Sequence, residues 1–426
     1  MKRLATFVTA VVLAGAAGAL ADLGGAFTPP LNHPAIEYGR RPTTDAIAKL
    51  NRRLEQGAAR LEFETAGRGY LRSILAALDI PVESQMVVFS KTGLRSRITN
   101  PKNPRAIYFN DSVVVAWVRG EPFVEIAAQD PRQGVHFYLL DQKEVHQPSV
   151  RKSGGCLTCH ESLTSMGVPG MILKSTFVTA DGAARFHLGF AVPDHRTPIE
   201  ERWGGWYVTG KAGNARHRGN AMVTDMEHPE AMITPETLNV ASLKDKFDTD
   251  AYLSPYSDIV ALLVFEHQMR LMNLITRVGW EVRVAIHDKQ SEKLPGLLRD
   301  AAREFVDYLL FVDEAPLNGR IEGSSGFAKV FAALGPRDRK GRSLRDLDLE
   351  RRLMRYPCSY MIYSEAFDGL PPEAKDAIYQ RMRHVLSGAE HDAKYARLSL
   401  ADRQAVLEIL RDTKKDWPTI SAHERN

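Results

Sequence analysis

The sequence predicts an α+β fold, in which an antiparallel, β-rich half packs against an α-helical C-terminal half. Between residues 86 and 140, short runs of β-branched and aromatic residues are separated by turn residues such as Asn, Asp, Gly and Pro, which is typical of consecutive antiparallel strands. From residue 235 onward, apolar residues recur every three or four positions, which is typical of amphipathic helices. The chain has 426 residues, enough for one large domain or two ordinary ones.

The N-terminus has the three parts of a secretory signal peptide. Lys2 and Arg3 precede an apolar run that ends at Ala19-Leu20-Ala21, and A-x-A is a typical cleavage site. We expect cleavage before Asp22 and export to the periplasm. The alternative is an uncleaved membrane anchor, for which the run is near the lower length limit. We expect no other stretch to cross a bilayer.

Removal of the signal peptide, residues 1–21, takes away two positive charges and lowers the formal net charge from +4 to +2. So small a charge is not the electrostatic footprint of a nucleic-acid-binding protein. The mature chain is expected to have a β-rich region with some N-terminal helices over residues 22–250 and a helical region over 251–426.

The β-rich region is expected to begin with a proline-rich extended arm, followed by two helices between residues 44 and 78. The predicted strands are 86–89, 106–109, 113–118, 123–127 and 135–140. A further hairpin is predicted from 171–179 and 184–192, because Ala180-Asp181-Gly182 between them is a turn sequence.

Between these strand segments lies Cys156-Leu157-Thr158-Cys159-His160, a C-x-x-C-H sequence. This is the attachment signature of a c-type haem, in which both thiols form thioether bonds to the porphyrin and the histidine binds the iron. The two residues between the cysteines let both sulfurs reach neighbouring vinyl groups along one helical turn. We therefore predict one covalent haem c held by Cys156, Cys159 and His160, with His160 as the proximal iron ligand.

Three other interpretations of the motif compete with haem attachment. A zinc site needs four ligands, usually from two such pairs, and the chain has no second C-x-x-C. A thioredoxin-like redox pair would lie in a βαβ context. A plain disulfide between Cys156 and Cys159 leaves His160 without a role. The remaining cysteine, Cys358, lies in an apolar segment and is expected to be a buried, inert thiol.

Four segments together are similar to a group of exported bacterial cytochrome c domain proteins of unassigned role. They are C-L-T-C-H, W-G-G-W-Y-V-T-G, the F-E-H-Q helix and Y-P-C-S-Y-M-I-Y-S-E-A-F-D, and the similarity spans most of the mature chain. The resemblance implies a covalent haem and export, and it implies no substrate. This chain resembles small soluble cytochromes c in the five-residue motif alone. Those proteins are all-helical, whereas the motif here lies between predicted strands.

The stretch after the motif begins with Thr197, which is expected to cap a short helix starting at Pro198. Aromatic residues then interleave with glycines from Trp203 to Gly210. This pattern fits a wall against a flat cofactor, and it equally fits a glycine-rich turn with tryptophans in the core.

The clearest helix of the C-terminal region is expected over residues 257–278, where His267 falls within the apolar stripe. Further helices are predicted over 294–310, over 327–334, from Pro371 to Gly388, and from a cap at Ser399.

The group that faces the iron opposite His160 decides the function. A second strong ligand makes an electron carrier, whereas an open position permits peroxide, oxygen or small-ligand chemistry. His267 is the first candidate, because a buried histidine must find a partner and iron would serve; a core histidine bonded to backbone or carboxylate is the competing interpretation.

His217 is the second candidate, because Arg216 and Arg218 beside it could pair with haem propionates. The competing interpretation is an exposed loop histidine. Met222 and Met226 follow closely in the chain, and Met166 is too near the motif to reach the opposite face of a haem easily.

From these observations we expect haem-dependent periplasmic electron transfer with a redox partner protein. The alternative is a mono-haem oxidoreductase of the peroxidase or oxygen-activating type, with His217 or His267 as an acid/base group and an arginine that stabilises charge. Chain length favours the alternative, since a carrier needs only about a quarter of this length to enclose a haem. The single C-x-x-C-H argues against a di-haem peroxidase.

Overall fold

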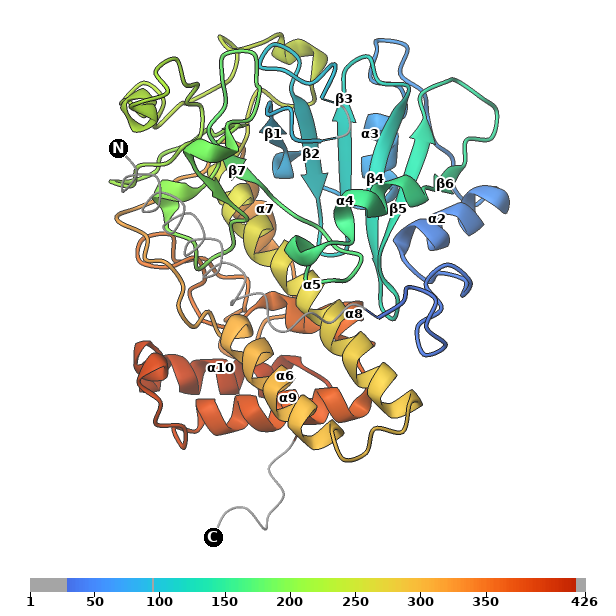
Figure 1. Cartoon of the computed structure of the whole chain (residues 1–426), viewed down its shortest axis with the longest axis vertical. Coiled ribbons are helices and arrows are strands. Elements are labelled where there is room, and N and C mark those ends of the chain that lie inside the picture. The colour runs from blue at the N-terminus through green and yellow to red at the C-terminus, as the bar shows by residue number, and fades with distance from the viewer. Residues whose placement is uncertain (1–28, 94–95, 419–426) are drawn as a thin grey trace, which may run out of the picture.

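The computed structural model describes residues 29–93 and 96–418, and it confirms the α+β class. Figure 1 shows the main sheet in one part of the molecule and most of the C-terminal helices gathered below it. The expected signal peptide, residues 1–21, and its cleavage site lie outside the described residues.

The main sheet has seven antiparallel strands in the order β6-β5-β4-β3-β2-β1-β9. All five strands predicted before the motif are confirmed, and the run 113–118 is correct at both ends. The strands are β1 (Met86–Val88), β2 (Arg105–Phe109), β3 (Val113–Val118), β4 (Phe123–Asp130), β5 (Gly134–Asp141), β6 (Val150–Lys152) and β9 (Trp206–Tyr207).

Alternate side chains of this sheet enter two different cores, because successive residues of a strand point to opposite faces. One face carries Val87, Tyr108 and Val115, and it packs against α2 (Ala46–Glu55) and α3 (Leu71–Ala77). The other face carries Val88, Ile107, Val114, Ala127 and Phe137, and it belongs to the larger core shared with the C-terminal helices. The C-x-x-C-H motif lies on this second side, since Cys156 and Leu157 pack against the larger core.

The long helix α5 (Ile259–His287) crosses the molecule diagonally in Figure 1 and joins the sheet to the helical part. Asp258 caps it by accepting hydrogen bonds from the backbone N–H groups of Val260 and Ala261, at 2.8 and 3.2 Å. The helix is longer at its C-terminal end than the predicted 257–278, because apolar residues such as Trp280 and Val282 continue its buried face.

The other C-terminal helices form at or near their predicted positions. Ser399 caps the last helix as expected, and Gly388 follows closely after the end of the one before it. The predicted helices are α6 (Leu294–Leu309), α7 (Phe327–Ala333), α9 (Pro372–Leu386) and α10 (Leu400–Thr413). The short helix α8 (Glu365–Asp368) was not predicted.

Two local predictions after the motif need correction. The hairpin is much shorter than expected: β7 (Ser175–Thr176) and β8 (Phe190–Ala191) have two residues each. Thr197 does not cap a helix, because its hydroxyl already accepts a hydrogen bond from the Asp194 N–H at 3.1 Å. The short 3₁₀ turn that follows is Ile199–Glu201.

One helix among the described residues is long and apolar enough to span a membrane, which the sequence-based expectation did not foresee. It is α5, and 94% of its most apolar window is buried inside the protein. Burial in the core accounts for its composition, so the finding is compatible with a chain in which this helix does not cross a membrane.

Candidate functional site

The C-x-x-C-H motif forms one compact helical turn directly after the edge strand β6. A 3₁₀ turn over Gly154–Cys156 leads into α4 (Leu157–His160), which lies in front of the sheet in Figure 1. The Cys159 side chain is exposed, whereas Cys156 and His160 are half-buried. No disulfide bond joins the two cysteines in this structure.

All three motif side chains line a single cleft between this turn and the larger-core face of the sheet. Its empty space measures about 1180 Å³ when the open solvent at its mouth is included. We call it the motif cleft. Its opposite wall consists of sheet residues that share one face, namely Val88, Arg105, Ile107, Val114, Ala116, Glu125, Ala127, Phe137 and Trp206.

The sheet wall is mostly apolar, and the side chains at its centre are small. Ala116 on β3 pairs across the sheet with Ile107 on one side and Glu125 on the other. Ala127, two residues beyond Glu125, adds a second methyl side chain. A wall of small and branched apolar side chains suits a flat, hydrophobic ligand.

The His160 ring is held by a hydrogen bond to Gly170 and by contact with the Phe137 ring, whose centroid lies 4.8 Å from its own. The Nδ1 atom of His160 lies 2.9 Å from the Gly170 carbonyl oxygen, and the Gly170 N–H donates to the His160 carbonyl at 2.9 Å. Because the ring must donate from Nδ1 to a carbonyl, the neutral tautomer has its lone pair on Nε2. A hydrogen bond of this kind is what usually orients a metal-ligating histidine.

Helix α5 holds the Gly170 segment in place through Asn273. The Asn273 side chain accepts a hydrogen bond from Met171 N–H at 2.9 Å and donates to the Met171 carbonyl at 2.7 Å. A Cβ atom on Gly170 would lie 2.2 Å from the Asn273 Oδ1 atom. Only glycine therefore fits at position 170, and the chain of contacts runs from α5 to the His160 ring.

Burial keeps His160 in its neutral form. It lowers the pKa of the imidazole below its usual value, and the positive charges of Arg105 and Lys174 act in the same direction. The bond to Gly170 and the carboxylate of Glu125 oppose this shift. A neutral imidazole with a free Nε2 lone pair is the form that binds a metal ion.

The motif cleft also contains a charged pair on the sheet wall. The Arg105 guanidinium lies 2.7 Å from the Glu125 carboxylate, and both side chains are about one-fifth exposed. Lys174 also lines the cleft, and its carbonyl accepts a hydrogen bond from Trp206 Nε1 at 2.9 Å. Because Arg105 already pairs with Glu125, Lys174 is the cation of this cleft that could pair with an acidic group of a ligand.

His267 does not line the motif cleft. It is fully buried, and both of its ring nitrogens have partners: Nδ1 lies 2.7 Å from His195 Nδ1, and Nε2 lies 2.7 Å from Ser359 Oγ. Its ring also stacks on Tyr308 and Phe311. His267 is therefore a hydrogen-bonded core histidine, although its partners are an imidazole and a hydroxyl and not the backbone or carboxylate expected.

His217 and the methionine candidates also lie outside the lining of the motif cleft. The His217 ring is buried, not exposed, and meets Trp203 edge to face at 5.1 Å between ring centroids. Met166 is in the larger core, Met222 packs against the core on the other face of the sheet, and Met226 is exposed.

One tryptophan of the glycine-rich stretch fits the interpretation as a cofactor wall, and the other fits the interpretation as a core residue. Trp206 lines the motif cleft, as expected for a cofactor wall. Trp203 is fully buried in the larger core, as expected for a packing residue. Cys358 is fully buried, and burial raises the pKa of its thiol far above the usual range, which agrees with an inert thiol.

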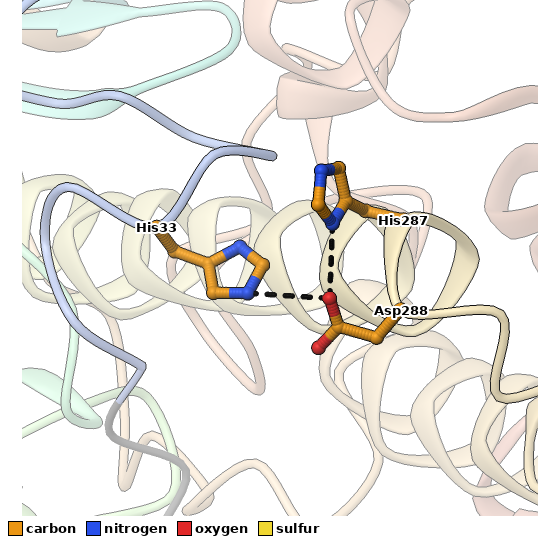
Figure 2. Close-up of side chains that lie close together, drawn as sticks. All are labelled: His33, His287 and Asp288. Carbon is orange, nitrogen blue, oxygen red and sulfur yellow. Dashed lines mark hydrogen bonds and ion pairs between the residues drawn. The ribbon is translucent and has the colours of Figure 1, made fainter.

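A second cluster of metal-ligand side chains lies far along the chain from the motif. Figure 2 shows His33, His287 and Asp288, the one such group of three among the described residues. His33 Nε2 and His287 Nδ1 lie 3.4 and 2.9 Å from the same Asp288 oxygen. His33 Nδ1 accepts a hydrogen bond from the Ala35 N–H at 3.2 Å, so its Nε2 carries the proton and donates to Asp288. The group is satisfied without a metal ion.

This cluster holds neither Cys156 nor Cys159, so within the described residues the motif cysteines lack the further ligands that a zinc site needs. The thioredoxin-like alternative also lacks its βαβ context, because the flanking strands β5 and β6 pair in antiparallel fashion. The described residues thus lend no support to the zinc or the thioredoxin-like alternative, and haem attachment stays a prediction.

No protein-family profile, curated protein or solved structure matches this chain. The site is therefore interpreted from its own residues.

Sequence reasoning missed several residues of the motif cleft. Arg105 is a charged residue at the start of an otherwise apolar strand, and Glu125 is a charged residue inside another strand. Asn273 is a polar residue on the apolar face of α5. Such breaks in an apolar pattern were the available signal. The sequence around Gly170 gave no such signal, because the role of this glycine depends on Asn273, about one hundred positions away in the chain.

Proposed function

We propose that this chain is an exported c-type haem protein that acts in periplasmic electron transfer. The observation that carries the proposal is the shared cleft: Cys156, Cys159 and the oriented imidazole of His160 all line one mostly apolar space. Lys174 at this cleft is suited to pair with a haem propionate.

In this proposal each residue has a defined task. Cys156 and Cys159 supply the thioether sulfurs, and His160 supplies Nε2 as the iron ligand while Gly170 holds its ring. The sheet wall excludes water from one side of the cleft, and the exposed Cys159 lies on the open side, where a redox partner can approach. When bound, the haem supplies a one-electron redox couple.

The experiment is a potentiometric titration of the protein produced together with a c-type haem maturation system. We expect haem that stays attached on a denaturing gel and is reduced and reoxidised reversibly in one-electron steps. A chain without covalent haem, or a haem that cannot be reoxidised reversibly, would overturn the proposal.

A second candidate function is a mono-haem oxidoreductase with an open iron position. The specific observation in its favour is that neither His267 nor His217, the two candidate distal ligands, lines the motif cleft. The same observation removes both residues as acid/base groups of this candidate. Binding of carbon monoxide to the reduced protein tests this candidate, because carbon monoxide binds only where a coordination position is open or weakly filled.

A further inference from the structure

We propose that Glu125 and Arg105 form an acid–base and charge-stabilising pair for the reduction of a small hydroperoxide, such as hydrogen peroxide, in the motif cleft. The inference rests on the proposed haem and deepens the second candidate function, because it names the substrate class and the residues that act on it. It assigns a role to a charged pair that haem attachment leaves unexplained.

The position of the pair supports this role. Glu125 lies on the sheet wall beside Ala116, where the side chains are smallest. Its carboxylate lies 2.7 Å from the Arg105 guanidinium. Both residues line the same cleft as His160, and both charges act on the His160 imidazole. The charged pair thus faces the space that the motif turn borders from the other side.

Most other lining residues of the sheet wall have apolar side chains that cannot transfer a proton. Val88, Ile107, Val114, Ala116 and Ala127 present only carbon atoms in their side chains. The one methionine of the lining, Met171, directly follows Gly170 and so belongs to the motif side of the cleft. Glu125 and Arg105 are therefore the charged side chains of the sheet wall, and they lie beside the small side chain of Ala116.

The chemistry of the step needs both members of the pair. The Glu125 carboxylate accepts the proton of one peroxide oxygen and delivers it to the other oxygen, which leaves as water when the O–O bond breaks. Arg105 stabilises the negative charge that develops on the leaving oxygen. In the whole reaction, hydrogen peroxide takes two electrons, one from each of two molecules of a reduced one-electron donor protein, and two protons from solvent, and two waters are formed.

Two probe ligands separate the proton transfer from mere access to the cleft. Hydrogen cyanide must lose a proton to bind ferric iron, so its binding rate responds to a nearby base. Carbon monoxide binds ferrous iron without any proton transfer, so its rate responds only to an open position and an open path.

The experiment compares the haem-loaded protein with its Glu125→Gln variant by stopped-flow spectroscopy. We expect the variant to bind cyanide about 100-fold more slowly and to lose about the same factor in peroxide-dependent oxidation of a reduced donor. Carbon monoxide should bind both proteins at the same rate. Glu125→Asp, which keeps a carboxylate, should recover much of the cyanide rate.

The matched control is Asp141→Asn on strand β5. It removes a carboxylate from an arginine ion pair of the same sheet, with Arg151 at 3.1 Å, but both side chains are exposed and outside the cleft. This control should leave all three rates unchanged.

Each other outcome has a distinct meaning. A protein without covalent haem would refute the proposed function itself. A haem-loaded protein that binds neither carbon monoxide nor cyanide would overturn the present inference and leave electron transfer standing. Equal cyanide rates in wild type and Glu125→Gln, or an equal loss of the carbon monoxide rate, would also overturn it. If Glu125→Gln does not fold, Glu125→Asp and the pH profile of cyanide binding decide the question.

Discussion

The Nδ1 atom of His160 and the carbonyl oxygen of Gly170 lie 2.9 Å apart, and a reciprocal backbone hydrogen bond joins the same two residues. This pair closes the loop between residues 160 and 170, and it ties the ring and the backbone of the motif histidine to one anchor. Because Asn273 holds the neighbouring backbone, the position of the His160 ring depends on helix α5 as well as on the motif.

We expect Cys156 and Cys159 to be the only residues that bind the haem covalently. Cys156→Ala combined with Cys159→Ala should abolish haem staining on a denaturing gel, since no thioether bond can form. The control is Cys358→Ala, which removes a buried thiol that does not line the motif cleft and should keep full staining. Staining that persists in the double variant would refute covalent attachment at this motif.

Asn273→Ala should destabilise the fold and loosen the His160 anchor. The substitution leaves the N–H and carbonyl groups of Met171 without their partner, and each buried polar group left unpaired costs about 1–3 kcal/mol. Denaturant unfolding measures the loss. A free energy of unfolding equal to that of wild type would show that water replaces the amide without cost.

Gly170→Ala should also destabilise the fold, but much less when Asn273 is already alanine. A Cβ at position 170 would meet the Asn273 Oδ1 atom at 2.2 Å, so the clash needs both residues. A double-mutant cycle measured by denaturant unfolding should therefore show strong coupling between the two substitutions. Additive effects would mean that the clash is with some other group.

His267→Ala should leave the haem spectrum unchanged while lowering stability. Both ring nitrogens of His267 are bonded within the core, to His195 and Ser359, and leaving such partners unpaired costs about 1–3 kcal/mol. His146→Ala at an exposed position serves as the control for stability. A change from a low-spin to a high-spin spectrum in His267→Ala would instead identify His267 as an iron ligand.

The protein should lose stability in mild acid, in part through His217. Burial lowers the pKa of His217 to about 4 in the folded state, whereas an unfolded histidine has a pKa of about 6.5. Between these values the unfolded state binds more protons, so the contribution of His217 is complete above pH 6.5 and is lost as pH falls toward 4.

The corresponding experiment is denaturant unfolding of wild type and His217→Asn at pH 7 and pH 5. The drop in unfolding free energy between these pH values should be smaller in the variant by about 2 kcal/mol. The carboxyl group of Glu266, whose pKa burial raises to about 7, works in the opposite direction in both proteins and cancels in the comparison. An equal drop in both proteins would show that His217 does not titrate in this way.

The sequence by itself determined the local features of this protein. β3 forms over residues 113–118 as predicted, and Ser399 caps the last helix, because strand alternation, helical periodicity and capping depend on residues close together in the chain. The C-x-x-C-H motif is local in the same sense: its helical turn needs only adjacent residues.

Only the tertiary structure decided what surrounds that turn. It brought Ala116, Glu125 and Arg105 from three strands to one wall opposite His160, and it placed His267 between His195 and Ser359, with both nitrogens occupied. The sequence pattern around His267 shows that the residue is buried but not which partner it meets. The physical reason is that contacts across a core depend on how distant elements pack against one another, and no local periodicity encodes that packing.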